Sequence, residues 1–166
     1  MCYEQDFKKR VHEVITRKQL CSIMNDTKWE NLQNNVLKKL PFPPPYQAKY
    51  VLDDILYPEN FENDVWYLGD WIEGLSPFFS VEWIRVRPRY QKHKGNLLPP
   101  ELIDISKEFL SILHELRIPY REENNTFFIY GYISNTDSLF KDNQLSSHEN
   151  EISSKLEKKH IKADPE

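Results

Sequence analysis

Histidines and cysteines are the side chains whose spacing would reveal metal or nucleophile chemistry most directly. They are His12, His93, His114, His148, His160, Cys2 and Cys21. No pair of histidines has metal-ligand spacing, and two cysteines near the start make neither a zinc quartet nor a disulfide framework. The sequence also has no glycine-rich phosphate loop and no serine in a nucleophile elbow. We therefore predict no catalytic residue, no metal site and no cofactor.

His93 is the best candidate for a general base, because it lies among Arg89, Lys92 and Lys94. Neighbouring cations lower the pKa of an imidazole and would keep it neutral, as a base for RNA cleavage must be. Solvated basic loops are nevertheless common in proteins, so we expect a protein without enzymatic activity. His114 lies near the end of a predicted helix, where a histidine often meets the negative end of the helix dipole.

Acidic and aromatic side chains in one segment are the second feature with chemical meaning. No Lys or Arg occurs between Lys49 and Arg85. The acids of this segment cannot all be paired within it, so we expect them to be exposed. Aromatic side chains anchor protein interfaces and charges steer association, so the pattern fits a surface for a basic protein. The predicted partner-binding residues are Asp53, Asp54, Glu59, Glu62, Asp64, Trp66, Asp70, Trp71 and Glu73. A plain solvated loop would have the same composition, and both interpretations stay open.

A basic strip follows the acidic segment directly and supports an alternative, a nucleic-acid interface. Its residues are Arg85, Arg87, Arg89, Lys92, His93 and Lys94. Against this alternative, the chain has a formal net charge of −4. Domains that bind nucleic acids without sequence preference are usually basic. Nucleic acid is therefore the less favoured partner.

Two helices are expected to support these segments. Residues 24–40 have a cap at Asn25, Asp26 or Thr27, and Trp29 begins an apolar stripe with helical spacing. The proline run 41–45 ends this helix, because proline lacks the amide donor. A second helix is predicted over residues 100–116, with Phe109 in its buried stripe.

The strands are expected between and after these helices. Residues 46–52 indicate a strand or a short helix, and residues 65–69 and 80–88 indicate strands. In the last of these, alternation places Ile84 and Val86 on one face and Trp83 with the arginines on the other. Residues 87–96, RPRYQKHKGN, are expected to leave the sheet as a basic loop. Residues 119–133 predict a hairpin with a turn at 123–126, since asparagine tolerates the positive φ of tight turns.

The order of these elements predicts an α+β fold in a single domain. We expect an antiparallel sheet of about four or five strands packed against two helices. Residues 1–23 are a lead segment with an amphipathic helix, 24–133 form the core domain, and 134–166 are a polar, mobile tail. No apolar run approaches the roughly 20 residues that span a bilayer. The first residues carry charges where a signal peptide is apolar, which predicts a cytoplasmic protein without membrane contact.

Three short motifs resemble a small bacterial family known only as a domain of unknown function. They are NDTKW at 25–29, VWYLGDW…SVEWIRV within 65–86, and FFIYGY at 127–132. The resemblance covers about residues 24–133, and some members look like immunity proteins of interbacterial toxin systems. It carries no catalytic residues. It implies a cytoplasmic inhibitor whose partner is a cognate toxin domain, with a basic nuclease as the expected toxin.

Overall fold

The structure is a computed structural model that describes residues 2–137 and 139. The helices are α1 (Cys2–Arg17), α2 (Asp26–Lys39), the 3-10 helix η1 (Phe78–Ser80) and α3 (Ser106–Glu115). The strands are β1 (Cys21–Ser22), β2 (Tyr46–Tyr50), β3 (Val81–Val86), β4 (Arg89–Lys92), β5 (Glu101–Asp104), β6 (Arg121–Glu123), β7 (Thr126–Tyr130) and β8 (Tyr132–Ile133). The predicted α+β class is confirmed.

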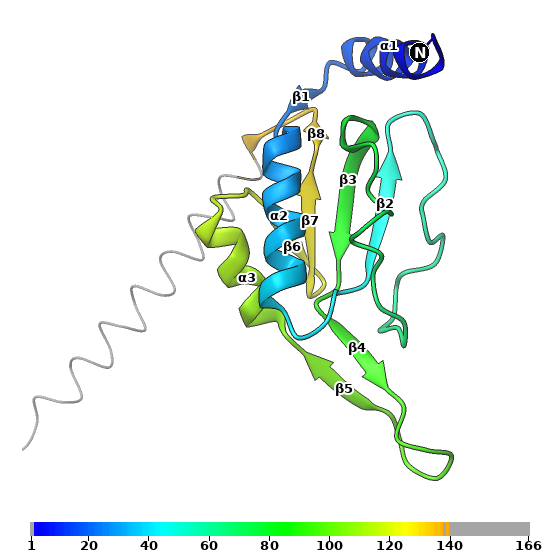
Figure 1. Ribbon diagram of the computed structural model, residues 1–166, viewed down its shortest axis with the longest axis vertical. Helices are drawn as coiled ribbons and strands as arrows, with labels where there is room; N and C mark the ends of the chain where they lie inside the picture. Colours follow the sequence, from blue (N-terminus) through cyan, green and yellow to red (C-terminus); the bar gives the residue numbers. More distant parts are fainter. Residues whose placement is uncertain (1, 138, 140–166) are drawn as a thin grey trace, which may run out of the picture.

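The main sheet has four antiparallel strands in the order β2-β3-β7-β6, and α2 and α3 lie against one of its faces (Figure 1). Ile84 pairs with Ile129 across β3 and β7, and both are fully buried. Phe109 from α3 packs into the same apolar cluster. Because side chains alternate along a strand, the residues that flank Ile84 in β3 lie on the opposite face of the sheet. That opposite face carries Arg85 and Phe128 as cross-strand partners.

Helix α2 forms as the sequence predicts. The Asn25 side chain accepts a hydrogen bond of 2.9 Å from the Lys28 amide, which satisfies a free donor of the first turn. Trp29, Leu32 and Val36 are buried against the sheet. The helix ends at Lys39, with Leu40 as its C-cap before the proline run.

The second predicted helix begins later than expected, and the preceding residues form a strand. Residues 101–104 pair with 89–92, so that β4 and β5 make a two-stranded arm instead of a helical turn and a loop. The Asp104 carboxylate accepts from the Ser106 amide at 2.8 Å in a local turn directly before α3. Figure 1 shows the arm projecting from the end of the sheet opposite α1.

The strand predicted over residues 65–69 is wrong. Val65 accepts a hydrogen bond of 2.7 Å from the Gln91 amide of β4, but Gly69 donates to Pro43, in another direction. A Cβ at Gly69 would lie 2.2 Å from the Pro44 carbonyl oxygen, so the backbone approaches the proline run as only glycine permits. The segment bends between two elements and cannot pair regularly with either.

The C-terminal hairpin is confirmed. Asn124 and Asn125 have φ of 51° and 56° at the turn between β6 and β7, the left-handed conformation expected for a two-residue hairpin. After Tyr130 the chain continues as β8, which pairs with β1 rather than extending β7. Of the predicted tail, only 134–137 and 139 are among the described residues.

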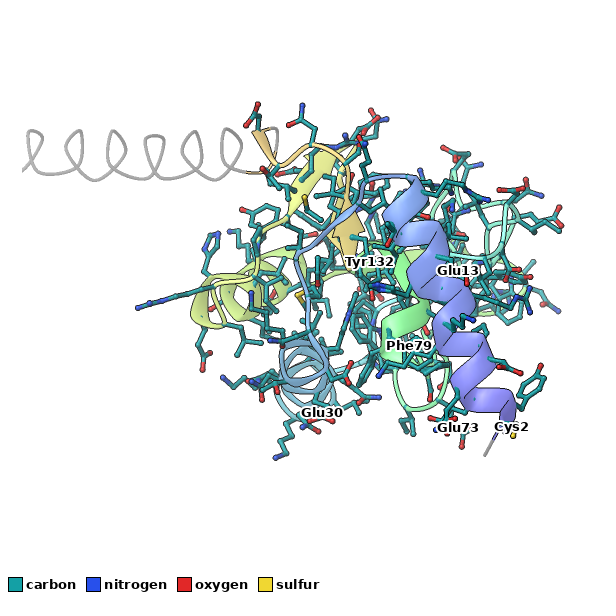
Figure 2. The ribbon with its side chains drawn as sticks, turned by 90° about the horizontal axis from the view of Figure 1, so that it is seen from above. Cys2, Glu13, Glu30, Glu73, Phe79 and Tyr132 are labelled. Atoms are coloured by element: carbon teal, nitrogen blue, oxygen red, sulfur yellow. The ribbon has the colours of Figure 1, made fainter. Side chains whose placement is uncertain are left out.

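Helix α1 lies across the end of the domain, as seen from above in Figure 2. Val11 is its buried residue, and the Phe7 ring lies 5.6 Å from the ring of Phe79 in η1. The Tyr132 hydroxyl donates to the Phe79 carbonyl at 2.9 Å, so β8 and η1 meet beneath the helix. The predicted amphipathic helix of the lead segment is therefore present.

Candidate protein-binding surface

The predicted partner-binding residues all lie in the stretch between β2 and η1, residues 51–77, here called the acidic connection. It contains no regular helix or strand, apart from an isolated bridge between Tyr57 and Ala48 of β2. Loops of this length without secondary structure are uncommon in compact domains and are usually functional or disordered. This one is ordered by contacts with the rest of the fold.

Apolar side chains fix the acidic connection to the core. Phe61, Trp71 and Leu75 are each 1% exposed. The Trp71 indole donates from Nε1 to the Pro44 carbonyl at 2.7 Å and packs on Phe109. Trp71 was predicted as a surface residue from its acidic neighbours, but its burial places it in the core. Of the two predicted tryptophans only Trp66, 77% exposed, is on the surface.

The proline run supplies acceptors for this attachment. Because prolines have no amide donor, few carbonyls of the run find a partner within it, and they can accept from other segments. The Pro43 carbonyl accepts from Gly69 at 3.1 Å, and the Pro45 carbonyl accepts from the Arg87 amide at 3.0 Å. Together with the Trp71 indole bond, the run holds one side of the acidic connection against the start of β2.

Two tyrosines of β2 hold the last part of the acidic connection. The Tyr46 hydroxyl donates to the Asp70 carbonyl at 2.5 Å, and the Tyr50 hydroxyl donates to the Gly74 carbonyl at 2.6 Å. Burial raises the pKa of both phenols, and nearby Asp70 adds to the effect. Both hydroxyls therefore stay protonated and remain donors at neutral pH. From α2, the Gln33 amide donates to the carbonyls of Trp71 and Ile72.

Arg85, Arg87 and Arg89, here called the arginine row, hold the middle of the acidic connection. Arg85 donates to Glu62 at 2.9 Å. Asp64 accepts from Arg89 at 2.6 Å and from Arg87 at 3.4 Å. The arginine row therefore pairs two of the acids that were expected to be free. The expectation failed because it considered only bases inside the acidic segment, whereas β3 and the start of β4 place the arginines of the next segment beside it.

The carbonyl and ring of Phe61 complete this attachment. Its carbonyl accepts from Arg87 at 2.6 Å and from Arg85 at 3.1 Å. Both guanidinium groups lie over its ring, at 5.5 Å for Arg85 and 5.1 Å for Arg87. Such cation–π contacts are strongest where the cation is desolvated. Burial lowers the pKa of the Arg87 guanidinium, but its acidic partner opposes that shift.

The remaining acids point to solvent in two groups. Asp53, Asp54 and Glu59 lie in residues 53–59, the part of the acidic connection beside β2, here called the β2 flank. Asp70 and Glu73 lie near α2, where the Asp70 carboxylate accepts from the Glu73 amide at 3.1 Å. All five are exposed, as predicted. Glu62 is also exposed, but its carboxylate forms the ion pair with Arg85.

Large apolar side chains accompany these acids, and most of them were not predicted. Ile55 and Tyr57 on the β2 flank are 54% and 48% exposed. Leu68 and Ile72 are 45% and 70% exposed, close to Trp66 and Glu73 respectively. Their sequence signal was weak, since isolated aliphatic residues in a polar loop are usually assigned to the core. Acids beside exposed apolar groups suit a protein interface, where apolar anchors supply affinity and charges steer association.

The six residues of the alternative nucleic-acid site are divided by the fold. The arginine row turns inward and is occupied by acids and carbonyls; Arg89 also donates to the Asn125 carbonyl at 2.6 Å. Lys92, His93 and Lys94 are exposed on the arm. Lys94 forms an ion pair of 2.8 Å with Glu101. The six residues therefore do not form one exposed strip.

Residues 2–137 and 139 hold no group of three or more His, Cys, Asp or Glu side chains placed to bind a metal ion. His114 shares a hydrogen bond of 3.1 Å with the Tyr120 hydroxyl. His93 lies in the loop of the arm, among exposed neighbours, where nothing shields a reacting group from water. No helix within the same described residues is both long and apolar enough to cross a membrane.

Comparison with known proteins identifies the family. The model of DUF6678, a family of unknown function, matches residues 11–136. The match covers most of the chain, so the chain belongs to this family, and the resemblance to a family of unknown function is confirmed. A search of curated proteins gave no match, and neither did a search of solved structures.

Proposed function

We propose that this member of DUF6678 is a non-enzymatic binding protein that acts in the cytoplasm. It would be an immunity protein that covers the active site of a basic toxin domain, such as a nuclease. The observation that supports this proposal is the acidic connection. Buried aromatic residues and the arginine row attach its backbone to the core. Its remaining acids and several apolar side chains face solvent.

Rigid attachment matters because a preformed surface loses less conformational entropy on binding than a mobile loop. Nuclease domains are basic where they bind phosphates, so exposed carboxylates compete for the same site. Trp66 and Ile72 provide the large apolar contacts that dominate protein interfaces. Trp71, Glu62 and Asp64 are left out of the proposed contact surface, because their side chains attach the acidic connection to the fold.

The nucleic-acid alternative receives less support from the geometry. Phosphate binding needs cations that are free to exchange their counterions for phosphate. Arg87 and Arg89 are buried and already paired with Asp64. Three exposed cationic or titratable side chains on the arm remain. They give a small basic patch in a chain with a net charge of −4.

The test is a pair of titrations with purified protein. One probe is the C-terminal domain of a toxin encoded beside this gene, and the other is bulk RNA. Wild-type protein should bind the toxin domain, and its affinity should fall between about 0.01 M and 0.15 M salt as the Debye length shrinks. Tight binding to RNA with no affinity for the toxin domain would contradict the proposal.

Two sets of variants locate the surface. Association should be slower for the triple variant Asp53→Lys/Asp54→Lys/Glu59→Lys. Its control makes the same charge change at exposed positions of α1, Glu4→Lys/Asp6→Lys/Glu13→Lys. Trp66→Ala should weaken binding about 30-fold, the effect of a hot-spot residue of about 2 kcal/mol. Leu37→Ala, at an exposed apolar residue of α2, is its control. Equal losses in variants and controls would show that the surface lies elsewhere.

A further inference from the structure

The tip of the β4–β5 arm is an exposed surface that the proposed function does not use. Residues 92–102 are all exposed. Leu97 is 97% exposed and Leu98 is 61% exposed, so two adjacent leucines face solvent at the end of a projecting element. Single exposed leucines need no explanation, whereas exposed apolar residues that lie together are a feature of contact sites.

The charge of the arm tip is opposite to that of the chain as a whole. Lys92, His93 and Lys94 precede the two leucines, whereas the whole chain has a net charge of −4. Glu101 neutralises one of the two lysines, because it pairs with Lys94 at 2.8 Å. The Lys94 ammonium lowers the pKa of the Glu101 carboxyl, so this pair persists into mildly acidic solution. The tip therefore offers cations together with aliphatic side chains.

The β2 flank has the complementary composition. Asp53, Asp54 and Glu59 are exposed there beside Ile55 and Tyr57. An interface between the tip and the β2 flank would pair carboxylates with ammonium groups and bury apolar side chains from both sides. The charge attraction and the burial of apolar surface both favour this contact.

The arm tip projects beyond one end of the main sheet, whereas the β2 flank lies beside β2, where Tyr57 bridges Ala48. The chain leaves β2 at the end of the sheet near α1, and the arm leaves from the other end (Figure 1). A tip therefore cannot reach the β2 flank of its own chain without moving the arm. Two copies side by side in antiparallel orientation would place each tip next to the other copy's β2 flank. The same contact then forms twice about a twofold axis, the commonest symmetry of homodimers.

We propose that the arm tip binds the β2 flank of a second copy of this chain, so that the protein forms a reciprocal dimer. The dimer uses part of the proposed partner surface, and a bound toxin domain and a second copy would compete for it. Its test nevertheless needs only the protein itself. A failure of self-association and a failure of toxin binding are therefore distinguishable.

Sedimentation equilibrium of the full chain over a range of concentrations tests the dimer. We expect a monomer–dimer equilibrium at an ionic strength of about 0.01 M that weakens at about 0.15 M, where the Debye length falls from about 30 to about 8 Å. Leu97→Ser/Leu98→Ser should weaken it about tenfold or more while keeping the Lys94–Glu101 pair. Leu37→Ser is the control at an exposed apolar residue of α2.

A charge exchange identifies the contacting surfaces. Lys92→Glu/Lys94→Glu alone, and Asp53→Lys/Asp54→Lys alone, should each be monomeric, because tip and flank then carry the same sign. A mixture of the two variants should dimerise again. Its pairs combine an acidic tip with a basic flank and a basic tip with an acidic flank. Thermal melting of each variant shows that the arm change has not unfolded the domain.

Several results would overturn the inference. The first is a wild-type monomer at every concentration and both ionic strengths. The second is a dimer that neither the leucine nor the charge variants affect, which would place the contact on another surface. The third is a monomeric wild type whose arm variants bind the toxin domain more weakly. That result would assign the arm to the toxin domain instead.

Discussion

Asp64 joins two buried cations of the arginine row to the acidic connection. Its carboxylate is partly exposed, whereas the side chains of Arg87 and Arg89 are 7% and 8% exposed. Removing one partner of a buried ion pair costs more than the pair itself contributes, because the other charge remains desolvated. Asp64 thus stabilises the fold, although its sequence context resembles that of the exposed acids.

Asp64→Asn should therefore lower the free energy of unfolding by at least about 2 kcal/mol, since hydrogen bonds to charged groups are worth about 1.5–3 kcal/mol and two guanidinium groups lose their carboxylate. Urea unfolding at neutral pH measures the change. Asp53→Asn makes the same substitution on the exposed β2 flank and should stay within about 0.5 kcal/mol of wild type. Similar losses in both variants would show that the arginine row does not depend on Asp64.

Among the elements, the arm and the start of α3 show how tertiary pairing overrides a local pattern. The sequence before Ser106 has apolar residues at helical spacing and prolines at a plausible first turn. In the fold, residues 101–104 pair with β4 as a strand, and α3 begins only at Ser106, whose amide donates to the Asp104 carboxylate. The basic residues of β4 had suggested a loop, so its partner strand could not be inferred either.

The acidic connection is attached to β3 partly through an exposed ion pair, and this makes its attachment pH-dependent. The hydrogen bond from Arg85, together with its charge, lowers the pKa of the Glu62 carboxyl in the folded state. An acid whose folded pKa is depressed contributes stability that is complete above its unfolded value, about 4.3. That contribution is lost as the pH falls through the folded pKa.

Wild-type protein should therefore lose more stability between about pH 5 and pH 3 than Glu62→Gln, which cannot titrate at this position. Arg85→Gln removes the same pairing from the other side and should reduce the pH dependence to a similar extent, although it lowers stability at every pH. Thermal midpoints across this pH range provide the measurement. An unchanged pH profile in Glu62→Gln would show that the ion pair seen here is not kept in solution.

For the whole molecule, the lead segment raises the question of where the folding unit begins. Helix α1 packs on η1 through Phe7 and Phe79, and β1 pairs with β8. The Ile23 amide also donates to the Gly131 carbonyl at 2.9 Å. The apolar cluster between the main sheet, α2 and α3 lies within residues 24–133.

A chain of residues 24–133 should therefore unfold cooperatively, but at a lower temperature than the full chain, because it lacks α1 and β1. Differential scanning calorimetry of the two chains checks this. A chain of residues 18–137 keeps β1 without α1 and should have an intermediate midpoint. A broad, non-cooperative transition for 24–133 would mean that the lead segment is required for folding.

Much of the fold followed from local sequence because local interactions determine it. Asn25 caps α2, the proline run ends that helix, and Asn124–Asn125 make the hairpin turn. In each case a side chain or a backbone restriction acts within a few residues. The alternation of β3 likewise placed Ile84 and Val86 in the core, because the side-chain period of a strand is fixed by its backbone.

The candidate surface depended on contacts between distant segments. The sequence determined that an acidic, aromatic stretch precedes a basic one. Only the tertiary structure decided that Glu62 and Asp64 face the arginine row while Asp53 and Glu73 face solvent. It also decided that Trp71 is core and Trp66 is surface. Burial and ion pairing depend on which segments meet in space, and the spacing of residues along a loop does not contain that information.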